Sequence, residues 1–255
     1  MYHIIARPIL LGLRPYQRAV MYVIATIYLS IFCDFSKSSN SYFAQQNNIF
    51  NLYFVKLSWG WTLVSLGLCL LVNSMNKRED EFESTIQIKR SLKMFIRLLI
   101  ATAVWYYGVN FFLIIEEGTG VCVVPKYLDK NTCKRNGFLW NGFDISGHCF
   151  LLVWCNLVIS EEIQASYSTK KEKVAKPEKE ITSIVENNKK SWNVDFLFYF
   201  LALLTVIWDV MIICTNMFFH TTSEKFLGTI IAVSSWAALY QFVYKTYFSN
   251  FLSLR

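Results

Sequence analysis

The sequence predicts an all-α integral membrane protein with six transmembrane helices and both termini in the cytoplasm. The chain of 255 residues is 54% hydrophobic and 17% aromatic, and its mean hydropathy is +0.33; such values are typical of proteins that sit in lipid. Six stretches reach or approach the ~20 apolar residues that cross a bilayer core. The basic residues between them alternate between dense and sparse segments, which indicates a multi-pass topology.

The expected spans follow one another without a linker rich in Pro, Gly and Ser and without an internal repeat, so one polytopic domain is predicted for residues 1–255. The spans are residues 19–33, 52–72, 94–115, 143–159, 194–219 and 226–248. No small-residue cleavage site follows the first, which we therefore expect to be an anchor and not a signal peptide. Residues 164–191, rich in Lys, Glu, Ser and Thr, are expected to form a basic, flexible cytoplasmic loop.

The distribution of Lys and Arg sets the expected orientation. Segments on the side of the termini hold 17 of these residues, and segments on the other side hold 6. Cytoplasmic segments carry the excess of basic residues, so both termini are expected in the cytoplasm. The net charge of +7 is explained by this bias and by attraction to anionic lipid. No nucleic-acid partner is expected, because the basic residues are scattered and no binding motif accompanies them.

Two of the three histidines lie at the same expected membrane face. His148 falls near the non-cytoplasmic end of the fourth span, and His220 closes the fifth span at that end. Two imidazoles at one depth could act together on a substrate whose polar head lies there. From position alone, the simpler alternative is that each histidine bonds a backbone carbonyl or water.

Ser146-Gly147-His148 opens the fourth span, where unpaired backbone N–H groups favour an anion and Gly147 lets a phosphate approach closely. A phosphate site is therefore a hypothesis, although a three-residue motif is a weak signal. Asp144 is interpreted as a structural cap of this helix.

Three of the other charged residues inside the spans need an interpretation. Lys56 lies about one turn into the second span and either extends to the headgroups or binds phosphate near the histidines. Asp209 falls on nearly the same helix face as His220 and is either a relay or, as we favour, a protonated core acid. Arg97 is expected to extend to the headgroups at the cytoplasmic end of its span.

The seven cysteines divide unevenly in this topology. Five lie in spans or at their ends, where buried thiols are ordinary packing. Cys122 and Cys133 share one non-cytoplasmic loop, an oxidising place in a secretory-pathway membrane, so a disulfide is predicted, with two free thiols as the alternative.

Several classes of site are disfavoured by the residue pattern. No metal site is expected, because two histidines without nearby Cys, His or Glu at ligand spacing do not form a zinc centre. No Gly-rich nucleotide loop and no Gly-x-Ser-x-Gly elbow occur. The spans also lack the paired broken helices and midplane charges of a secondary transporter.

Four stretches carry a resemblance to a known family. They are "NIFNLYFVKLSWGWT" (48–62), "IEEGTGVC" (115–122), "LWNGFDISGHCFLL" (139–152) and "FFHTTSEKFLGT" (218–229). Together they closely resemble the fat storage-inducing transmembrane family, in the same order and over most of the chain. The family is in turn similar to the lipid phosphate phosphatases, whose helical core joins a Ser-Gly-His element to a second histidine.

The resemblance implies a multi-pass endoplasmic reticulum protein that supports lipid droplet formation and lipid homeostasis. The implied activity is hydrolysis of fatty acyl-CoA at its diphosphate, giving acyl 4′-phosphopantetheine and adenosine 3′,5′-bisphosphate at a site that faces the lumen. His220 would be the nucleophile, and His148 would be the general acid and base. Diacylglycerol and triacylglycerol are implied as further ligands, with Phe150, Leu151 and Leu152 as the candidate contacts.

The chain departs from the phosphatase pattern around its second histidine and around Lys56. Cys214-Thr215 stands where the phosphatases have Ser-Arg, and Lys56 lacks the Arg-Pro that should follow it. Phosphate charge would then be neutralised by Lys56, by the loop cations Lys126, Lys130, Lys134 and Arg135, or by a divalent ion carried by the substrate; no resident cofactor is expected. Glu224 stands where the phosphatases keep an orienting Asp.

Two other functions stay open at this stage. The first is a non-enzymatic protein that binds diacylglycerol and triacylglycerol through Phe150–Leu152 and partitions them into droplets. The second is a phosphatase of phosphatidic or lysophosphatidic acid that uses the same two histidines.

Overall fold

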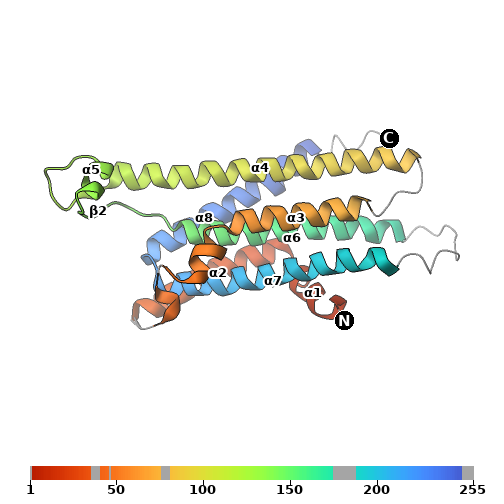
Figure 1. The fold of residues 1–255 in the computed structure, drawn as a ribbon, viewed down its shortest axis with the longest axis horizontal. Coiled ribbons are helices and arrows are strands. Elements are labelled where there is room, and N and C mark those ends of the chain that lie inside the picture. Colours follow the sequence, from red (N-terminus) through yellow and green to blue (C-terminus); the bar gives the residue numbers. More distant parts are fainter. Residues whose placement is uncertain (1, 36–40, 46, 76–80, 175–187, 249–255) are drawn as a thin grey trace.

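The computed structural model describes residues 2–35, 41–45, 47–75, 81–174 and 188–248, which form an elongated bundle of helices (Figure 1). The helices are α1 (Tyr2–Leu11), α2 (Pro15–Phe35), η1 (Tyr42–Ala44), η2 (Phe50–Val55), α3 (Ser58–Met75), α4 (Glu81–Thr119), α5 (Lys130–Arg135), α6 (Gly147–Val174), α7 (Asn188–Phe218), α8 (Thr222–Trp236) and η3 (Ala237–Phe248). Two short strands, β1 (Val121–Cys122) and β2 (Trp140–Asn141), pair antiparallel, with Val121 opposite Asn141.

Four helical segments in the described part of the chain are long and apolar enough to cross a membrane. They are Leu92–Thr119, Gly147–Ser166, Phe196–Phe218 and Thr222–Tyr244, and they overlap the last four expected spans. The first two expected spans correspond to α2 and to η2 with α3, and their membrane crossing stays a prediction. The structure therefore supports an all-α membrane protein with four membrane-spanning helices among the described residues.

The expected loop at 164–191 is too long. Helix α6 continues to Val174 and α7 begins at Asn188, so only 175–187 separate the two helices, and that segment lies outside the described residues. The polar residues after Ser166 continue α6 beyond its apolar segment, because the Lys and Glu residues of this stretch are compatible with a solvated helix.

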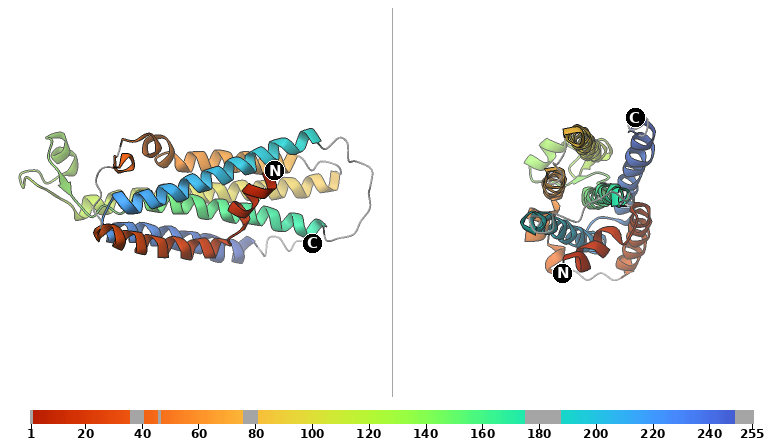
Figure 2. Two further views of the ribbon diagram at one scale, coloured as in Figure 1. Left: turned by 90° about the horizontal axis from the view of Figure 1, so that it is seen from below. Right: turned by 90° about the vertical axis from the view of Figure 1, so that its right-hand side faces the viewer.

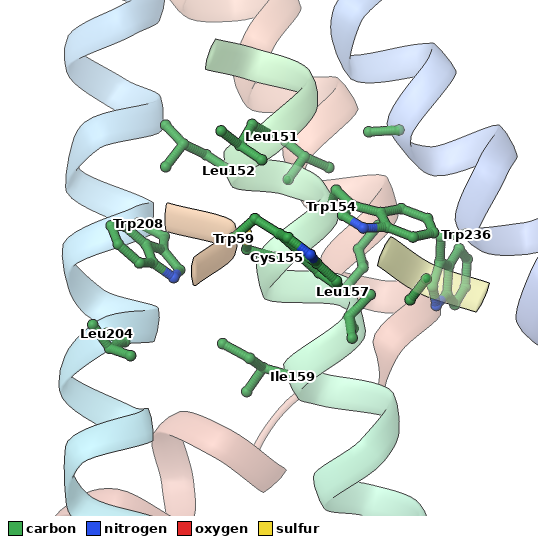
Figure 3. Packing of buried hydrophobic residues seen from close by; sticks show 14 of the residues in the cluster. Trp59, Leu151, Leu152, Trp154, Cys155, Leu157, Ile159, Leu204, Trp208 and Trp236 are labelled. Carbon is green, nitrogen blue, oxygen red and sulfur yellow. The ribbon is translucent and has the colours of Figure 1, made fainter. Parts of the chain in front are cut away.

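Helix α6 is the centre of the bundle. It packs against α1, α2, α3, α4, α7 and α8, and 78% of its apolar segment is buried, compared with 17% for α4. The end-on view in Figure 2 shows α6 surrounded by the other helices and α4 at the edge. Residues 150–159 of the fourth expected span would face lipid if this helix lay at the edge of the bundle. That interpretation is wrong, because their side chains fill the protein interior (Figure 3).

The contact between α4 and α6 depends on one small residue. A Cβ atom at Gly108 would lie 2.8 Å from Cζ of Phe150, and the Phe150 ring also meets Phe112 edge-on and stacks near Trp154. Lipid is as apolar as these side chains, so helix association in a membrane relies on such close van der Waals packing. Phe150 is consequently fixed between helices and not presented to lipid.

A cluster of polar side chains surrounds Glu162, in the C-terminal half of α6. Glu162, which is fully buried, accepts from the Arg97 guanidinium at 2.8 Å and from the Tyr240 hydroxyl at 3.0 Å. The guanidinium also lies over the rings of Tyr240 and Tyr244. The expectation that Arg97 only extends to the headgroups is therefore wrong: Glu162 on the central helix draws it into the bundle.

Asp209 forms another polar contact inside the bundle. Its Oδ1 atom accepts from the Tyr22 hydroxyl and from Nδ2 of Asn156, both at 2.8 Å. These bonds join α7 to α2 and α6. Both partners are structural donors, so the contacts support a core acid more than a proton relay.

Candidate active site

The two histidines lie at one end of the bundle, which we call the histidine end (residues 144–148 and 220–224). Helices α6 and α8 both begin there, and α7 ends there (Figure 1). Ser146 donates its backbone N–H to the carbonyl oxygen of Glu224 at 3.1 Å, which joins the two segments directly. A Cβ atom at Gly228 would overlap the Ser146 carbonyl oxygen, so glycine permits this close approach of α8 to the start of α6.

The Ser146-Gly147-His148 element is the N-terminus of α6. The Oγ atom of Ser146 accepts from the backbone N–H of Cys149 at 3.3 Å, in the manner of a helix N-cap. Ser146 therefore occupies the capping position that the sequence suggested for Asp144, whose carboxyl group points toward His220 instead. The remaining N–H groups of the first turn and the positive end of the helix dipole favour an anion at this place.

His148 is oriented by an asparagine that the sequence analysis did not single out. Its Nε2 lies 2.8 Å from Oδ1 of Asn51 on η2. An amide oxygen only accepts, so with this partner Nε2 carries the proton and Nδ1 has the free lone pair. His148 also interacts electrostatically with Lys56 and His220, which places Lys56, Asn51 and both histidines in one neighbourhood.

His220 lies in a tight turn between α7 and α8. Its φ of +60° makes it the one described non-glycine residue in the left-handed region, which costs of order 1 kcal/mol or more and persists only where surrounding contacts impose it. Its Nδ1 lies 3.7 Å from Oδ2 of Asp144 and 3.7 Å from Oε2 of Glu224. With both carboxylates on the Nδ1 side, Nε2 is the ring atom available for chemistry.

Glu224 connects the two histidine segments. Its Oε2 atom accepts from the backbone N–H of Thr221 at 2.8 Å, and its Oε1 atom accepts from that of Asp144 at 3.3 Å. Burial raises the pKa of Asp144, helped by the negative charges of Glu116 and Glu224 and opposed by His220. The fold thus holds one of the two acids near His220, Asp144, in a region that penalises its charge.

The cations of the 120–142 loop lie in a separate arrangement. Lys130 and Lys134 pair with Glu116 at 2.7 and 3.8 Å, and Lys126 lies over the ring of Tyr127. Cys122 and Cys133 form a disulfide with a Cα–Cα distance of 5.9 Å. The pairing with Glu116 already neutralises part of the charge that the sequence analysis assigned to phosphate, which leaves Lys56 as the candidate cation nearest to His148.

The candidate neutral-lipid contacts are not exposed. Phe150 and Leu152 are fully buried, and Leu151 is nearly so; Figure 3 shows Leu151 and Leu152 on α6 among the residues of the core. The reason is the central position of α6.

Among the described residues, no group of three His, Cys, Asp or Glu side chains could hold a metal ion.

Sequence reasoning missed the roles of three residues that lie at or beside the two histidine segments: Asn51, Asp144 and Lys225. Asn51 stands inside an apolar stretch, and a polar residue at membrane depth is by itself a signal of function. Asp144 was assigned to capping because it precedes the helix, and Lys225 was counted only as a loop charge.

A family model and several known proteins match this chain over most of its length. The model of the fat storage-inducing transmembrane protein family matches residues 39–114 and 110–240. The chain is 33% identical over 228 residues to the Homo sapiens acyl-coenzyme A diphosphatase FITM2, which covers 86% of this chain and 79% of the relative. The same name is given to a Xenopus tropicalis relative, 35% identical over 80% of this chain and 74% of the relative.

The Drosophila melanogaster protein of that name is 31% identical over 253 residues. This match covers 90% of the present chain, which spans 58% of that longer relative. No solved structure matches the fold. The family model covers well over half of the sequence and includes both histidine segments, so this chain belongs to the fat storage-inducing transmembrane family.

Proposed function

We propose that this chain is a membrane hydrolase that cleaves the diphosphate of fatty acyl-CoA, giving acyl 4′-phosphopantetheine and adenosine 3′,5′-bisphosphate. The single observation that carries the proposal is the convergence of His148 and His220 at one end of the bundle, with two carboxylates on Nδ1 of His220. Relatives named acyl-coenzyme A diphosphatase support the substrate. The structure supports the roles of the residues.

His220 is the proposed nucleophile. Asp144 and Glu224 lie on the Nδ1 side of the ring and favour a proton there, which leaves the Nε2 lone pair for phosphorus and stabilises the positive charge that develops on the ring. Nε2 forms a bond to one phosphorus while the bridging P–O bond breaks. The left-handed turn at residue 220 keeps the ring at the surface of the histidine end, where a polar headgroup has access.

His148 is the proposed general acid and then general base. Because Nε2–H is donated to Asn51, proton transfer occurs at Nδ1. The protonated ring gives a proton to the departing phosphate oxygen. Water then attacks the phosphohistidine, His148 takes the proton from that water, and the second phosphate product leaves. The net reaction consumes one water molecule and returns His220 to its neutral form and His148 to its protonated form.

The charge of the diphosphate is shared by the N-terminus of α6 and by Lys56. A divalent ion carried by the substrate is the other source of positive charge, and a magnesium titration of the activity separates the two. Phe150–Leu152 have no exposed surface, so a neutral-lipid carrier is not adopted as a second function.

Six spans, cytoplasmic termini and an endoplasmic reticulum location complete the proposal. They put the histidine end in the lumen, on the side of the disulfide-bonded loop. A disulfide is stable in that compartment, which supports this orientation over the reverse. Labelling of a cysteine introduced at an exposed loop position such as Leu128 tests it, because a luminal site reacts only after the membrane is opened.

The activity is tested with detergent-purified protein and oleoyl-CoA, with products separated by mass spectrometry. Release of 3′,5′-ADP by the wild-type protein, and a loss of at least about 100-fold in His148→Ala and His220→Ala, are expected. Unchanged release from both variants contradicts the assignment. Release of inorganic phosphate from phosphatidic acid, without 3′,5′-ADP from acyl-CoA, identifies a lipid phosphate phosphatase instead.

A further inference from the structure

Lys225 is a buried lysine in the first turn of α8, adjacent to Glu224. It is 2% exposed, and its ammonium group donates to the backbone carbonyl of Asn216 at 2.8 Å. Among the ion pairs between described residues, none includes Lys225. A charged group inside a membrane-spanning segment is costly and is retained where it has a role.

The bond from Lys225 spans the turn that holds His220. Asn216 lies in the last turn of α7, where backbone carbonyls lack helical partners and the helix dipole is negative. A cation at this place satisfies a carbonyl through a charge-assisted bond and interacts favourably with the dipole. The lysine therefore ties the end of α7 to the start of α8 on either side of His220, whose φ of +60° requires such a constraint.

Asn216 extends this connection toward the other histidine. It is fully buried; its Oδ1 atom accepts from the Cys149 thiol at 3.8 Å, and its Nδ2 atom donates to Oγ1 of Thr26 at 3.4 Å. Cys149 directly follows His148. One buried polar network thus connects the backbone beside each histidine, with the Lys225 ammonium as its charged member.

We infer that Lys225 is a positioning residue that holds the His220 turn in its left-handed conformation and in register with His148. This inference rests on the proposed function for its kinetic consequence, but its structural consequence does not depend on any activity. The lysine is buried behind the turn and does not contact the substrate. It acts through the position of His220.

Kinetics of Lys225 variants give the first test. Lys225→Met keeps the length and apolar stem but loses the ammonium, so kcat per folded molecule for oleoyl-CoA should fall about tenfold or more because the attacking ring is misplaced. KM should change less than about twofold, because no substrate contact is removed. Lys225→Arg should restore part of kcat, since it keeps a charged donor.

Chemical modification of His220 gives a test without activity. The imidazole is 17% exposed in the folded protein, and loss of the tie should speed its reaction with diethyl pyrocarbonate several-fold, as followed by peptide mass spectrometry. Arg97→Met is the matched control: it also removes a charge-assisted contact, but at the other end of α6, so it should leave the His220 reaction and kcat per folded molecule unchanged.

The outcomes separate the two claims. Wild-type rates of both His220 modification and turnover in Lys225→Met overturn the positioning role. If the wild-type protein has no activity on oleoyl-CoA, the proposed function is contradicted. Faster modification of His220 in Lys225→Met would still support the positioning role. If Lys225→Met does not fold, Lys225→Gln replaces it; this variant keeps a neutral donor and should show an intermediate effect, whereas wild-type behaviour in both measurements overturns the inference.

Discussion

The two ends of α6 carry polar clusters of opposite character. In the cluster around Glu162, Arg97 and Glu162 meet at 2.8 Å, with Glu162 fully buried and two tyrosine rings beside the guanidinium. At the histidine end, His220 lies 3.7 Å from each of two carboxylates. The first cluster satisfies charge by direct contact, and the second leaves its charges at distances that a ligand or a protonation change can shorten.

This difference shows how one helix can contribute to stability in one half and to a reaction in the other. A buried ion pair is sensitive to the loss of one partner because the other charge remains in a region of low dielectric. A looser, partly exposed group of acids and imidazoles contributes little to stability and can change charge during a reaction. Removing single side chains from each end should therefore separate folding from turnover.

The largest effect on stability is expected for Arg97→Met. It leaves the Glu162 carboxylate buried without its cation and should lower the free energy of unfolding by about 3–5 kcal/mol, as measured by thermal or denaturant unfolding in detergent. Turnover per folded molecule should not change, because the histidine end is at the other end of α6.

The double variant Arg97→Met/Glu162→Gln is the control for that substitution. Replacing the stranded carboxylate by a neutral amide should recover much of the lost stability. Equal destabilisation in the single and double variants would show that packing of the Arg97 stem against the two tyrosines, and not charge, dominates this cluster.

The second prediction concerns Asn51→Leu at the histidine end. The substitution leaves Nε2–H of His148 without its acceptor, at a cost of about 1–3 kcal/mol. If that cost falls on the oriented catalytic ring, turnover drops about 5- to 160-fold. Asn51→Asp, which restores an acceptor oxygen, should recover activity. Tyr53→Leu on the same helix, η2, changes an exposed side chain and should leave turnover unchanged. Full activity in Asn51→Leu would remove the asparagine from the mechanism.

The sequence predicts the helical membrane class and both histidines, because hydropathy, charge distribution and the family motifs are local properties. It does not predict which helix is central. Phe150 and Glu162 both follow a hydropathy pattern compatible with a lipid-facing span, and only the packing of six helices around α6 shows that both are buried. A single sequence cannot give that count of neighbours.

Contacts between distant segments were missed for a related reason. The pairs His148–Asn51 and Arg97–Glu162 join residues that are 97 and 65 positions apart, and neither lies at a spacing that signals contact. The bond from Lys225 to Asn216 is closer in sequence but crosses a turn. The sequence placed Lys225 between two expected spans, one residue before the sixth, and this position did not distinguish it from a loop charge.

The smallest effect is expected from two aspartates outside the spans, whose pKa values shift in opposite directions. Burial raises the pKa of Asp144, so its ionised form costs stability once the pH exceeds the unfolded-state value of about 4. Backbone hydrogen bonding from Thr132 lowers the pKa of Asp129, so its ionised form adds stability that is lost as the pH falls through the folded value. Unfolding of Asp144→Asn and Asp129→Asn across the pH range tests these signs.

At pH 7, Asp144→Asn should be as stable as the wild-type protein or slightly more stable, and Asp129→Asn slightly less stable; both differences should vanish well below pH ~4, where each carboxyl is protonated in both states. Turnover should follow a different order. Protonated Asp144 no longer supports the charge on His220, so the activity ratio of wild type to Asp144→Asn should be larger at pH 7 than at acid pH. A ratio independent of pH would mean that Glu224 alone orients the nucleophile, and the histidine end would then resemble the cluster around Glu162 in depending on one carboxylate.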